Sequence, residues 1–307
     1  MKNNYILIIM DKLISLTDVS QEELRRWQLK LLDILVYFKE FCEKHDLTFY
    51  LSYGTMLGAV RHNGFIPWDD DIDVSMPRED YDKLYDLWEK HADKARFSCC
   101  KTTTGNCIYF PMTLIRDNNT TCIYEHSKHL DLCHGLKIDV EFLDGVPNSS
   151  FLRMKQVFFA RMYALFSTQR VPNAVYKSGR SAIRIIAKTL LTIFRSAKVK
   201  DFIWMYSEKQ IKKYNFSKCQ YIRHLGLRLQ KKEWYKDVIY MDFEGHKMPV
   251  PVGYDEILRS AYGDYMQLPP IEGRIPITKV VFYDLENGYK KYKGIHYCVE
   301  SNKDNDL

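Results

Sequence analysis

The chain has 307 residues, of which 46% are hydrophobic and 14% aromatic, enough for a buried core in one large domain or two modest ones. This composition excludes disordered, collagen-like and low-complexity proteins. The formal net charge of +6 is unevenly distributed, because residues 145–200 contain eleven Lys or Arg and no Asp or Glu, which leaves the remainder of the chain acidic.

The first residues and the cysteines bear on the cellular compartment. The apolar run from Ile6 to Met10 is far shorter than the about 20 residues of a spanning helix, and no small-residue cleavage site follows it. The eight cysteines are irregularly spaced, unlike the framework of a secreted disulfide-rich protein. We therefore expect a cytoplasmic protein without a signal peptide or membrane span, with the inner face of the membrane as a candidate location.

The first half of the chain predicts alternating helices and strands. Apolar residues spaced three and four apart predict a helix over residues 21–45. The β-formers of residues 47–53 predict a strand that runs into a glycine turn at Gly54, with a short helix over 54–61. A turn at residues 64–67 leads into an acidic strand over residues 68–74.

The later elements complete an α+β pattern. Residues 78–91 predict a second amphipathic helix, and residues 136–142 alternate between apolar and charged side chains, which predicts a strand. After Pro147 the chain becomes basic and helical, with one helix expected over residues 181–197. We expect a small mixed sheet flanked by helices, with additional helical segments.

Changes in composition suggest two boundaries, near residues 147 and 215. They would separate a catalytic core (1–147), a basic helical segment (148–215) and a C-terminal helical lobe (216–307) that packs on the core. Because no Gly/Ser linker marks either boundary, the three parts can also form one compact unit.

Four carboxylates crowd into five positions at Asp69, Asp70, Asp71 and Asp73. Such neighbours repel one another unless they are protonated or paired with a cation. On a strand, Asp71 and Asp73 would point to the same face and offer oxygens to one Mg²⁺ ion, with Mn²⁺ as an alternative. Asp69 and Asp70 are expected to lie next to the metal ligands without binding the ion directly. The alternative interpretation is a cluster that caps a helix or decorates a solvated turn.

Residues on other elements can complete this site. Asp139, on the polar face of the strand over residues 136–142, is the candidate third carboxylate. The turn at Gly54 and Thr55 can present backbone N–H groups and a hydroxyl to a phosphate. Arg61 is a candidate hydrogen-bond donor to a phosphate group, and His62 is a second candidate.

The segment over residues 50–81, YLSYGTMLGAVRHNGFIPWDDDIDVSMPREDY, resembles the signature of the LicD family of phosphocholine transferases, whose eukaryotic relatives include fukutin and fukutin-related protein. Weaker blocks at residues 116–121 with 135–140, and at 262–270, agree in chain order. The resemblance implies a nucleotidyltransferase-like fold in which the Gly54–Thr55 turn and the carboxylates of Asp71, Asp73 and Asp139 match the shared pattern.

The resemblance also implies a reaction. Enzymes of this family are understood to transfer a phospho-alcohol from a donor such as CDP-choline, or another CDP-alcohol, to a sugar hydroxyl and to release CMP. The expected acceptor is a cell-surface glycan, such as lipopolysaccharide or teichoic acid, or its lipid-linked oligosaccharide precursor. Asp71 and Asp73 would hold the metal against the diphosphate, and Asp139 would complete the metal site or accept the proton of the acceptor hydroxyl.

The sequence leaves open which alcohol is transferred, and it leaves two alternative functions open as well. Recognition of choline calls for aromatic rings around the quaternary ammonium, and Trp68 and Tyr53 flank the expected site as candidates. A true nucleotidyltransferase would release pyrophosphate instead of CMP. A non-catalytic scaffold on the membrane is the third hypothesis, and the intact set of Asp71, Asp73 and Asp139 argues against it.

Other segments predict possible partners less directly. The basic helix over residues 181–197 is a candidate for peripheral contact with an anionic bilayer, or else packs on the core with its basic face against the acidic remainder. No DNA- or RNA-binding module is recognisable, so we expect no nucleic-acid partner. The cysteines and histidines of residues 99–134 contain no C-x-x-C pair, which favours buried free thiols over a zinc site.

Overall fold

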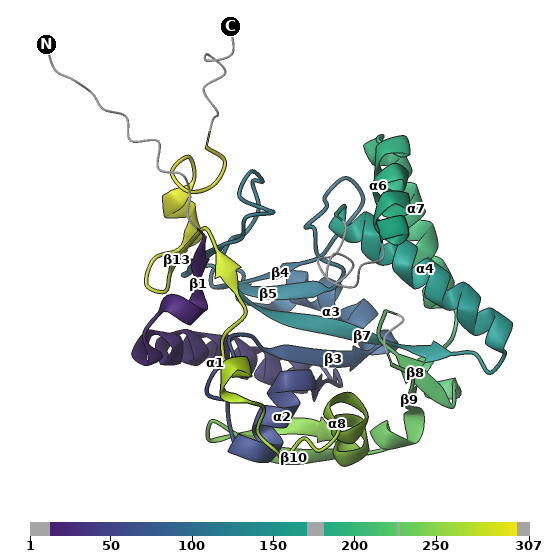
Figure 1. Cartoon of the computed structure of the whole chain (residues 1–307), viewed down its shortest axis with the longest axis horizontal. Helices are drawn as coiled ribbons and strands as arrows, with labels where there is room; N and C mark the ends of the chain where they lie inside the picture. Colours follow the sequence, from purple (N-terminus) through teal and green to yellow (C-terminus); the bar gives the residue numbers. More distant parts are fainter. Residues whose placement is uncertain (1–12, 171–180, 226–227, 300–307) are drawn as a thin grey trace, which may run out of the picture.

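A computed structural model describes residues 13–170, 181–225 and 228–299. Its centre is a mixed sheet with the strand order β2-β3-β7-β5-β4 (Figure 1). These strands are β2 (Tyr50–Leu51), β3 (Asp73–Pro77), β7 (Leu136–Val146), β5 (Thr113–Asp117) and β4 (Phe97–Cys100). β3 and β7 run parallel, while the other neighbours in this order are antiparallel. The fold is α+β, as the sequence predicts.

Chain segments from the C-terminal half extend and flank this sheet. The far end of β7 pairs with β8 (Tyr221–Arg223), which pairs with β9 (Gln230–Lys231). A hairpin of β10 (Val238–Phe243) and β11 (His246–Pro251) lies beside α2. Two further pairs join β1 (Ile14–Ser15) to β12 (Lys279–Val280), and β6 (Thr121–Ile123) to β13 (Phe282–Asp284). Strands from before residue 147 and from after residue 215 thus share one sheet.

The helices of the described ranges are α1 (Gln21–Lys44), α2 (Tyr53–His62), α3 (Arg78–His91), α4 (Ser150–Thr168), α6 (Ser181–Ile193), α7 (Ala197–Ile211) and α8 (Tyr254–Tyr262). α1 and α3 bury their apolar stripes on the sheet, where Tyr81 packs edge-on against Phe142 of β7. In the described ranges, no helix combines the length and the apolar character that crossing a bilayer requires.

Short 3-10 helices lie at Leu16–Asp18, Phe216–Lys218, Lys232–Tyr235, Ile271–Gly273 and Tyr289–Tyr292. The two amphipathic helices expected over residues 21–45 and 78–91 are confirmed to within one residue. Two other expectations are wrong in extent. The strand expected over residues 47–53 is reduced to Tyr50–Leu51, and the strand expected over 136–142 continues to Val146 because its end pairs with β8.

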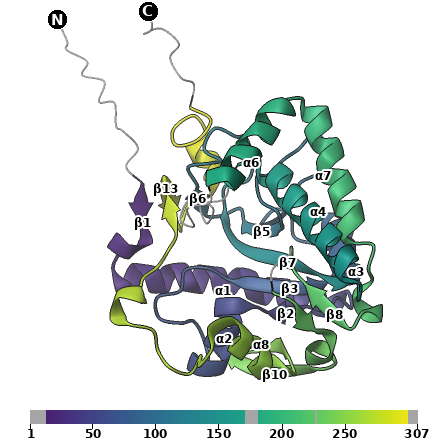
Figure 2. The ribbon, with the colours of Figure 1, turned by 45° about the vertical axis from the view of Figure 1, so that its right-hand side comes forward.

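The basic segment also differs from its prediction. The helix expected over residues 181–197 is α6, which ends four residues earlier at Ile193, and α7 begins at Ala197 after its N-cap Ser196. The extended backbone of Ser196 separates the two helices. α4, α6 and α7 lie together on one side of the sheet (Figure 2).

Candidate active site

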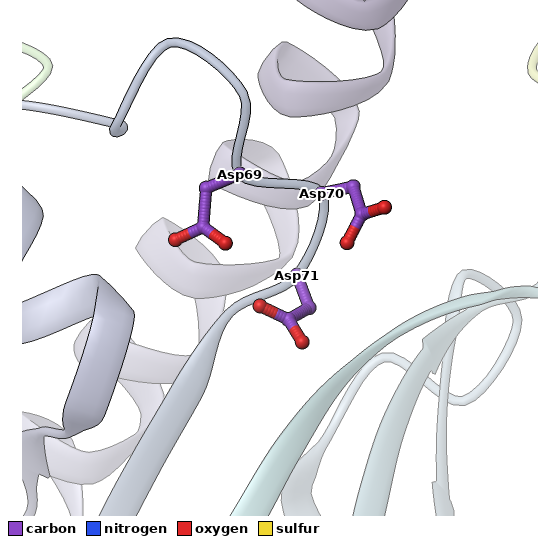
Figure 3. Close-up of side chains that lie close together, drawn as sticks. All are labelled: Asp69, Asp70 and Asp71. Carbon is purple, nitrogen blue, oxygen red and sulfur yellow. The ribbon is translucent and has the colours of Figure 1, made fainter. Parts of the chain in front are cut away.

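An acidic loop precedes β3 and carries Asp69, Asp70 and Asp71 (Figure 3). One carboxylate oxygen of each of these residues lies within 4.8 Å of one from each of the others. Two side chains of α1 hold the loop, because Trp27 Nε1 donates to the Asp70 carbonyl at 2.9 Å and Gln28 Nε2 donates to the Asp69 carbonyl at 2.9 Å. These two carbonyls therefore accept hydrogen bonds from α1 and not from a neighbouring strand.

The strand consequently begins later than expected. The prediction of a strand over residues 68–74 is wrong, since β3 begins at Asp73 and Asp71 lies in the loop before it. The predicted alternation of burial still holds around the boundary, because Ile72 and Val74 are fully buried in the core. These apolar anchors fix the backbone from which Asp71 and Asp73 project.

The parallel pairing of β3 and β7 places Asp73 directly opposite Asp139. Burial raises the pKa of the Asp73 carboxyl well above its usual value, and the neighbouring charges of Asp71 and Asp139 raise it further. Burial also raises the pKa of Asp71 to about 6. The three predicted metal ligands are therefore close enough to repel one another in a poorly hydrated site, which a divalent cation would relieve.

The tightest group of carboxylates nevertheless differs from the predicted one. Among the described residues, Asp69, Asp70 and Asp71 form the group whose oxygens lie within 4.8 Å, whereas the prediction named Asp71, Asp73 and Asp139. Burial and the charges of Asp71 and Asp70 raise the pKa of Asp69 to about 8, so Asp69 belongs to the same electrostatic site. The Asp70 carboxylate accepts the Thr278 backbone N–H at 2.8 Å, which gives it a structural contact.

Lys137 is a site residue that the sequence analysis did not single out. Its Nζ lies 2.5 Å from Asp139 Oδ1, and it lies 5.4 Å and 5.9 Å from the ring centroids of Phe110 and Tyr124. Lys137 is 8% exposed, so its charge acts in a poorly hydrated environment. The spacing of two residues between Lys137 and Asp139 on one strand was the available signal, because it places both side chains on the same face.

Gly54 and Thr55 lie in the first turn of α2 rather than in a turn before a helix. A Cβ atom at Gly54 would lie 2.8 Å from Asp69 Oδ2, so glycine lets that carboxylate approach the N-terminal end of α2. The Thr55 hydroxyl oxygen accepts the Asp73 backbone N–H at 2.9 Å, and the residue is 3% exposed. Thr55 thereby ties α2 to the start of β3.

A pocket of about 730 Å³ opens beside this end of α2, and Gly54, Arg61, Trp68, Asp69, Tyr262 and Arg274 are among its lining residues. Arg61 Nη1 donates to the Tyr265 carbonyl at 2.6 Å. Burial and the nearby charge of Arg274 lower the pKa of Arg61. Two neighbouring guanidinium groups in one pocket favour an anionic ligand.

The two aromatic residues proposed to bind choline, Trp68 and Tyr53, line different cavities. Trp68 lines the 730 Å³ pocket, where the Arg274 guanidinium lies 5.6 Å from its ring centroid. Tyr53 instead lines a cavity of about 280 Å³. Tyr262 lines both cavities, and burial together with the carboxylates of Asp69, Asp73 and Asp71 raises its pKa to about 12. Tyr262 is therefore the aromatic residue that the sequence analysis missed.

A pocket of about 500 Å³ lies on the other side of the acidic loop, with Asp70, Asp71, Lys137, Tyr124 and Arg170 in its lining. Asp69 faces one pocket and Asp71 the other, so the acidic loop separates two spaces that could hold two substrates. His62 lines neither pocket, and its Nδ1 accepts Arg61 Nε at 3.5 Å.

The eight cysteines are free thiols. Within the described ranges, no three Cys or His side chains bring their ligand atoms close enough together for a metal ion. Cys99, Cys122 and Cys42 are buried, as small apolar side chains often are.

Comparisons with known proteins agree with this geometry. Residues 46–130 match the family model described as "LicD/FKTN/FKRP, nucleotidyltransferase domain", a range that contains the acidic loop and β3. The chain is 32% identical over 277 residues to the lipopolysaccharide cholinephosphotransferase LicD of Haemophilus influenzae, covering 82% of this chain and 95% of that protein. It is also 35% identical over 79 residues to the uncharacterized protein RT0683 of Rickettsia typhi, covering 25% of this chain and 26% of that protein.

The match to the Haemophilus influenzae protein extends far beyond the family-model range. β7, which carries Asp139, lies beyond the family-model range. The chain belongs to the LicD family.

Proposed function

We propose that this protein transfers phosphocholine from CDP-choline to a hydroxyl of lipopolysaccharide, a related surface glycan or its lipid-linked precursor, and releases CMP in the cytoplasm. The observation that carries the proposal is the convergence of partly buried carboxylates on β3 and β7, in a chain that aligns with 95% of a lipopolysaccharide cholinephosphotransferase. Another CDP-alcohol would use the same chemistry, so choline is the finer part of the proposal.

The proposed cofactor is a magnesium ion. Asp71, Asp73 and Asp139 would hold it, because Mg²⁺ prefers oxygen ligands and the crowded carboxylates supply excess negative charge. Mn²⁺ is an alternative with the same ligand preference. When bound, the ion would neutralise charge on the diphosphate and on the leaving CMP.

The larger pocket suits the donor. Arg61 and Arg274 supply two guanidinium groups for phosphate oxygens, and the rings of Trp68 and Tyr262 offer aromatic faces to a trimethylammonium group. The acceptor hydroxyl would approach from the pocket lined by Lys137 and Asp71.

Two residues of β7 can stabilise charge and accept a proton during transfer. Lys137 would donate to a phosphate oxygen and offset the charge that develops there. Asp139 would either complete the metal site or accept the proton of the acceptor hydroxyl, and the two roles require it to exchange its contact with Lys137.

Product analysis tests the proposal. The full chain is incubated with Mg²⁺, CDP-choline and lipopolysaccharide that lacks phosphocholine, and a parallel reaction contains CTP and choline phosphate. We expect CMP and phosphocholine-bearing glycan in equal amounts from the first reaction and no pyrophosphate from the second. Pyrophosphate release would establish a true nucleotidyltransferase, and the absence of any turnover with CDP-choline or with CDP-ethanolamine, CDP-ribitol and CDP-glycerol would support a non-catalytic scaffold.

A further inference from the structure

An apolar face lies on α4 and α7, which pack against each other on one side of the sheet (Figures 1 and 2). Three phenylalanines leave most of their side chains in solvent, since Phe151 is 69%, Phe158 57% and Phe202 66% exposed. We define the α4–α7 face by its exposed apolar residues, Phe151, Met154, Phe158, Val199, Phe202, Met205 and Tyr206. Large apolar side chains gathered in this way mark an interaction surface.

Three aromatic residues of this face, Phe158, Tyr206 and Phe202, are connected across both helices through the half-buried Phe159. Phe158 and Phe159 lie 5.3 Å apart between ring centroids, and Phe159 lies 5.6 Å from Tyr206 on α7. Tyr206 then lies 6.1 Å from Phe202 with the two rings stacked. These three exposed rings therefore belong to one patch rather than to scattered positions.

The charges around the patch are positive. α4 contains no Asp or Glu, and the two carboxylates of α7 have partners elsewhere in the protein. Asp201 accepts the Gly105 backbone N–H at 2.9 Å, and Glu208 Oε1 lies 3.5 Å from Arg78 Nη1. The exposed cations Lys155, Arg161, Lys198 and Lys209 form no ion pair with any described residue.

The α4–α7 face is distinct from the helix that the sequence analysis singled out, α6, whose contact with a bilayer stays a prediction. Ala187, Leu190 and Leu191 of α6 pack partly against the core, while four isoleucines of the same helix, Ile183, Ile185, Ile186 and Ile193, are exposed. The exposed rings that can enter a bilayer interface lie on α4 and α7.

We propose that the α4–α7 face docks on an anionic lipid bilayer. Its rings would enter the interfacial region, and the flanking Lys and Arg would lie near lipid phosphates. A second copy of this chain fits the face less well, because symmetric pairing would bring these unpaired cations together. The proposal does not depend on the reaction that the acidic site performs.

Vesicle flotation tests the proposal with the full chain at low salt. Vesicles of phosphatidylcholine alone are compared with vesicles that also contain phosphatidylglycerol. We expect binding to the anionic vesicles only. The double variant Phe158→Ser/Phe202→Ser and the double variant Lys155→Glu/Lys198→Glu should each weaken binding at least about tenfold. Tyr240→Ser and Lys44→Glu, which change exposed residues on β10 and α1, serve as matched controls.

Several results would overturn the proposal. They are no binding to anionic vesicles, equal binding to both kinds of vesicle, or unchanged binding by both double variants when circular dichroism confirms that they are folded. Sedimentation velocity in the absence of lipid adds another: a dimer that Phe158→Ser/Phe202→Ser dissociates would assign the face to a second copy. Because the charge variant alters only exposed, unpaired side chains, it keeps the test decisive if the aromatic variant fails to fold.

Discussion

At the scale of single residues, Asp69 is the clearest case of a side chain kept at a cost to stability. Burial and two neighbouring carboxylates raise its pKa to about 8 in the folded protein, whereas an unfolded chain would ionise it near its ordinary value of 3.8. The folded state then binds the proton more tightly, so this residue increasingly destabilises the metal-free protein as the pH rises between these two values. Such a residue is expected where a bound cation compensates the charge.

Asp69→Asn should therefore stabilise the metal-free protein, and more at about pH 8 than at about pH 5. A gain of at least about 1 kcal/mol at the higher pH is reasonable, since one pKa unit corresponds to roughly 1.4 kcal/mol. Urea unfolding with a chelator present measures it. A loss of stability that is equal at both pH values would show that the Asp69 carboxylate is not under electrostatic strain.

A variant of Lys137 tests how its positive charge affects the carboxylates of the site. In Lys137→Met, Asp139 loses its cationic partner, so Mn²⁺ should bind more tightly while phosphocholine transfer slows by roughly tenfold or more. Electron paramagnetic resonance of added Mn²⁺ and the transfer assay measure the two effects. Lys101→Met, which removes a cation near Tyr81, is the control. Unchanged transfer with weaker metal binding would contradict the role given to Lys137.

At the scale of elements, two glycines of α2 have different roles, one in the shape of the site and one in the stability of the fold. A Cβ at Gly54 would meet the movable Asp69 carboxylate at 2.8 Å, whereas a Cβ at Gly58 would meet the Gly64 carbonyl at 2.4 Å. Gly54→Ala should therefore reduce transfer with little change in unfolding free energy, while Gly58→Ala should destabilise the protein by roughly 1–3 kcal/mol because the backbone must move. Equal effects of both variants on stability, with transfer by Gly54→Ala unaffected, would contradict this assignment.

The elements also show how far the sequence predicts the site. Periodic apolar residues predicted α1 and α3, and the alternation around Asp139 predicted β7. The start of β3 was wrong because Trp27 and Gln28, more than 40 residues earlier, capture the carbonyls of the acidic loop. No local pattern encodes such a contact. Arg274 and Tyr262 were missed as site residues for the same reason, since the fold brings them to α2 from the C-terminal part of the chain.

At the scale of the whole molecule, a buried ion pair connects the sheet to the helices after it. Arg78 at the start of α3 forms a bidentate pair with Asp144 of β7, at 2.7 Å and 3.0 Å, and its guanidinium lies 3.5 Å from the ring centroid of Phe142. Arg78 also reaches Glu208 of α7 at 3.5 Å. The pair therefore joins the sheet, α3 and the basic helical segment.

Asp144→Asn would leave the Arg78 charge buried without its main partner. We expect a loss of about 3–5 kcal/mol in unfolding free energy. The exposed pair between Asp242 and Lys247 is the control, because Asp242→Asn should cost no more than about 1 kcal/mol. Urea titration of both variants measures the difference, and similar small losses in the two would show that the buried pair does not hold these elements together.

The central claim is that the carboxylates at the start of β3 and β7 perform the transfer. The most direct measurement is the initial rate of phosphocholine transfer from CDP-choline with Mg²⁺, for wild type and for Asp71→Asn, Asp73→Asn and Asp139→Asn. The exposed Asp131, which pairs with Lys293, provides the control Asp131→Asn. We predict that each of the three variants loses about 100-fold or more in rate while the control stays within about twofold. Near-normal transfer by all three variants would contradict the account.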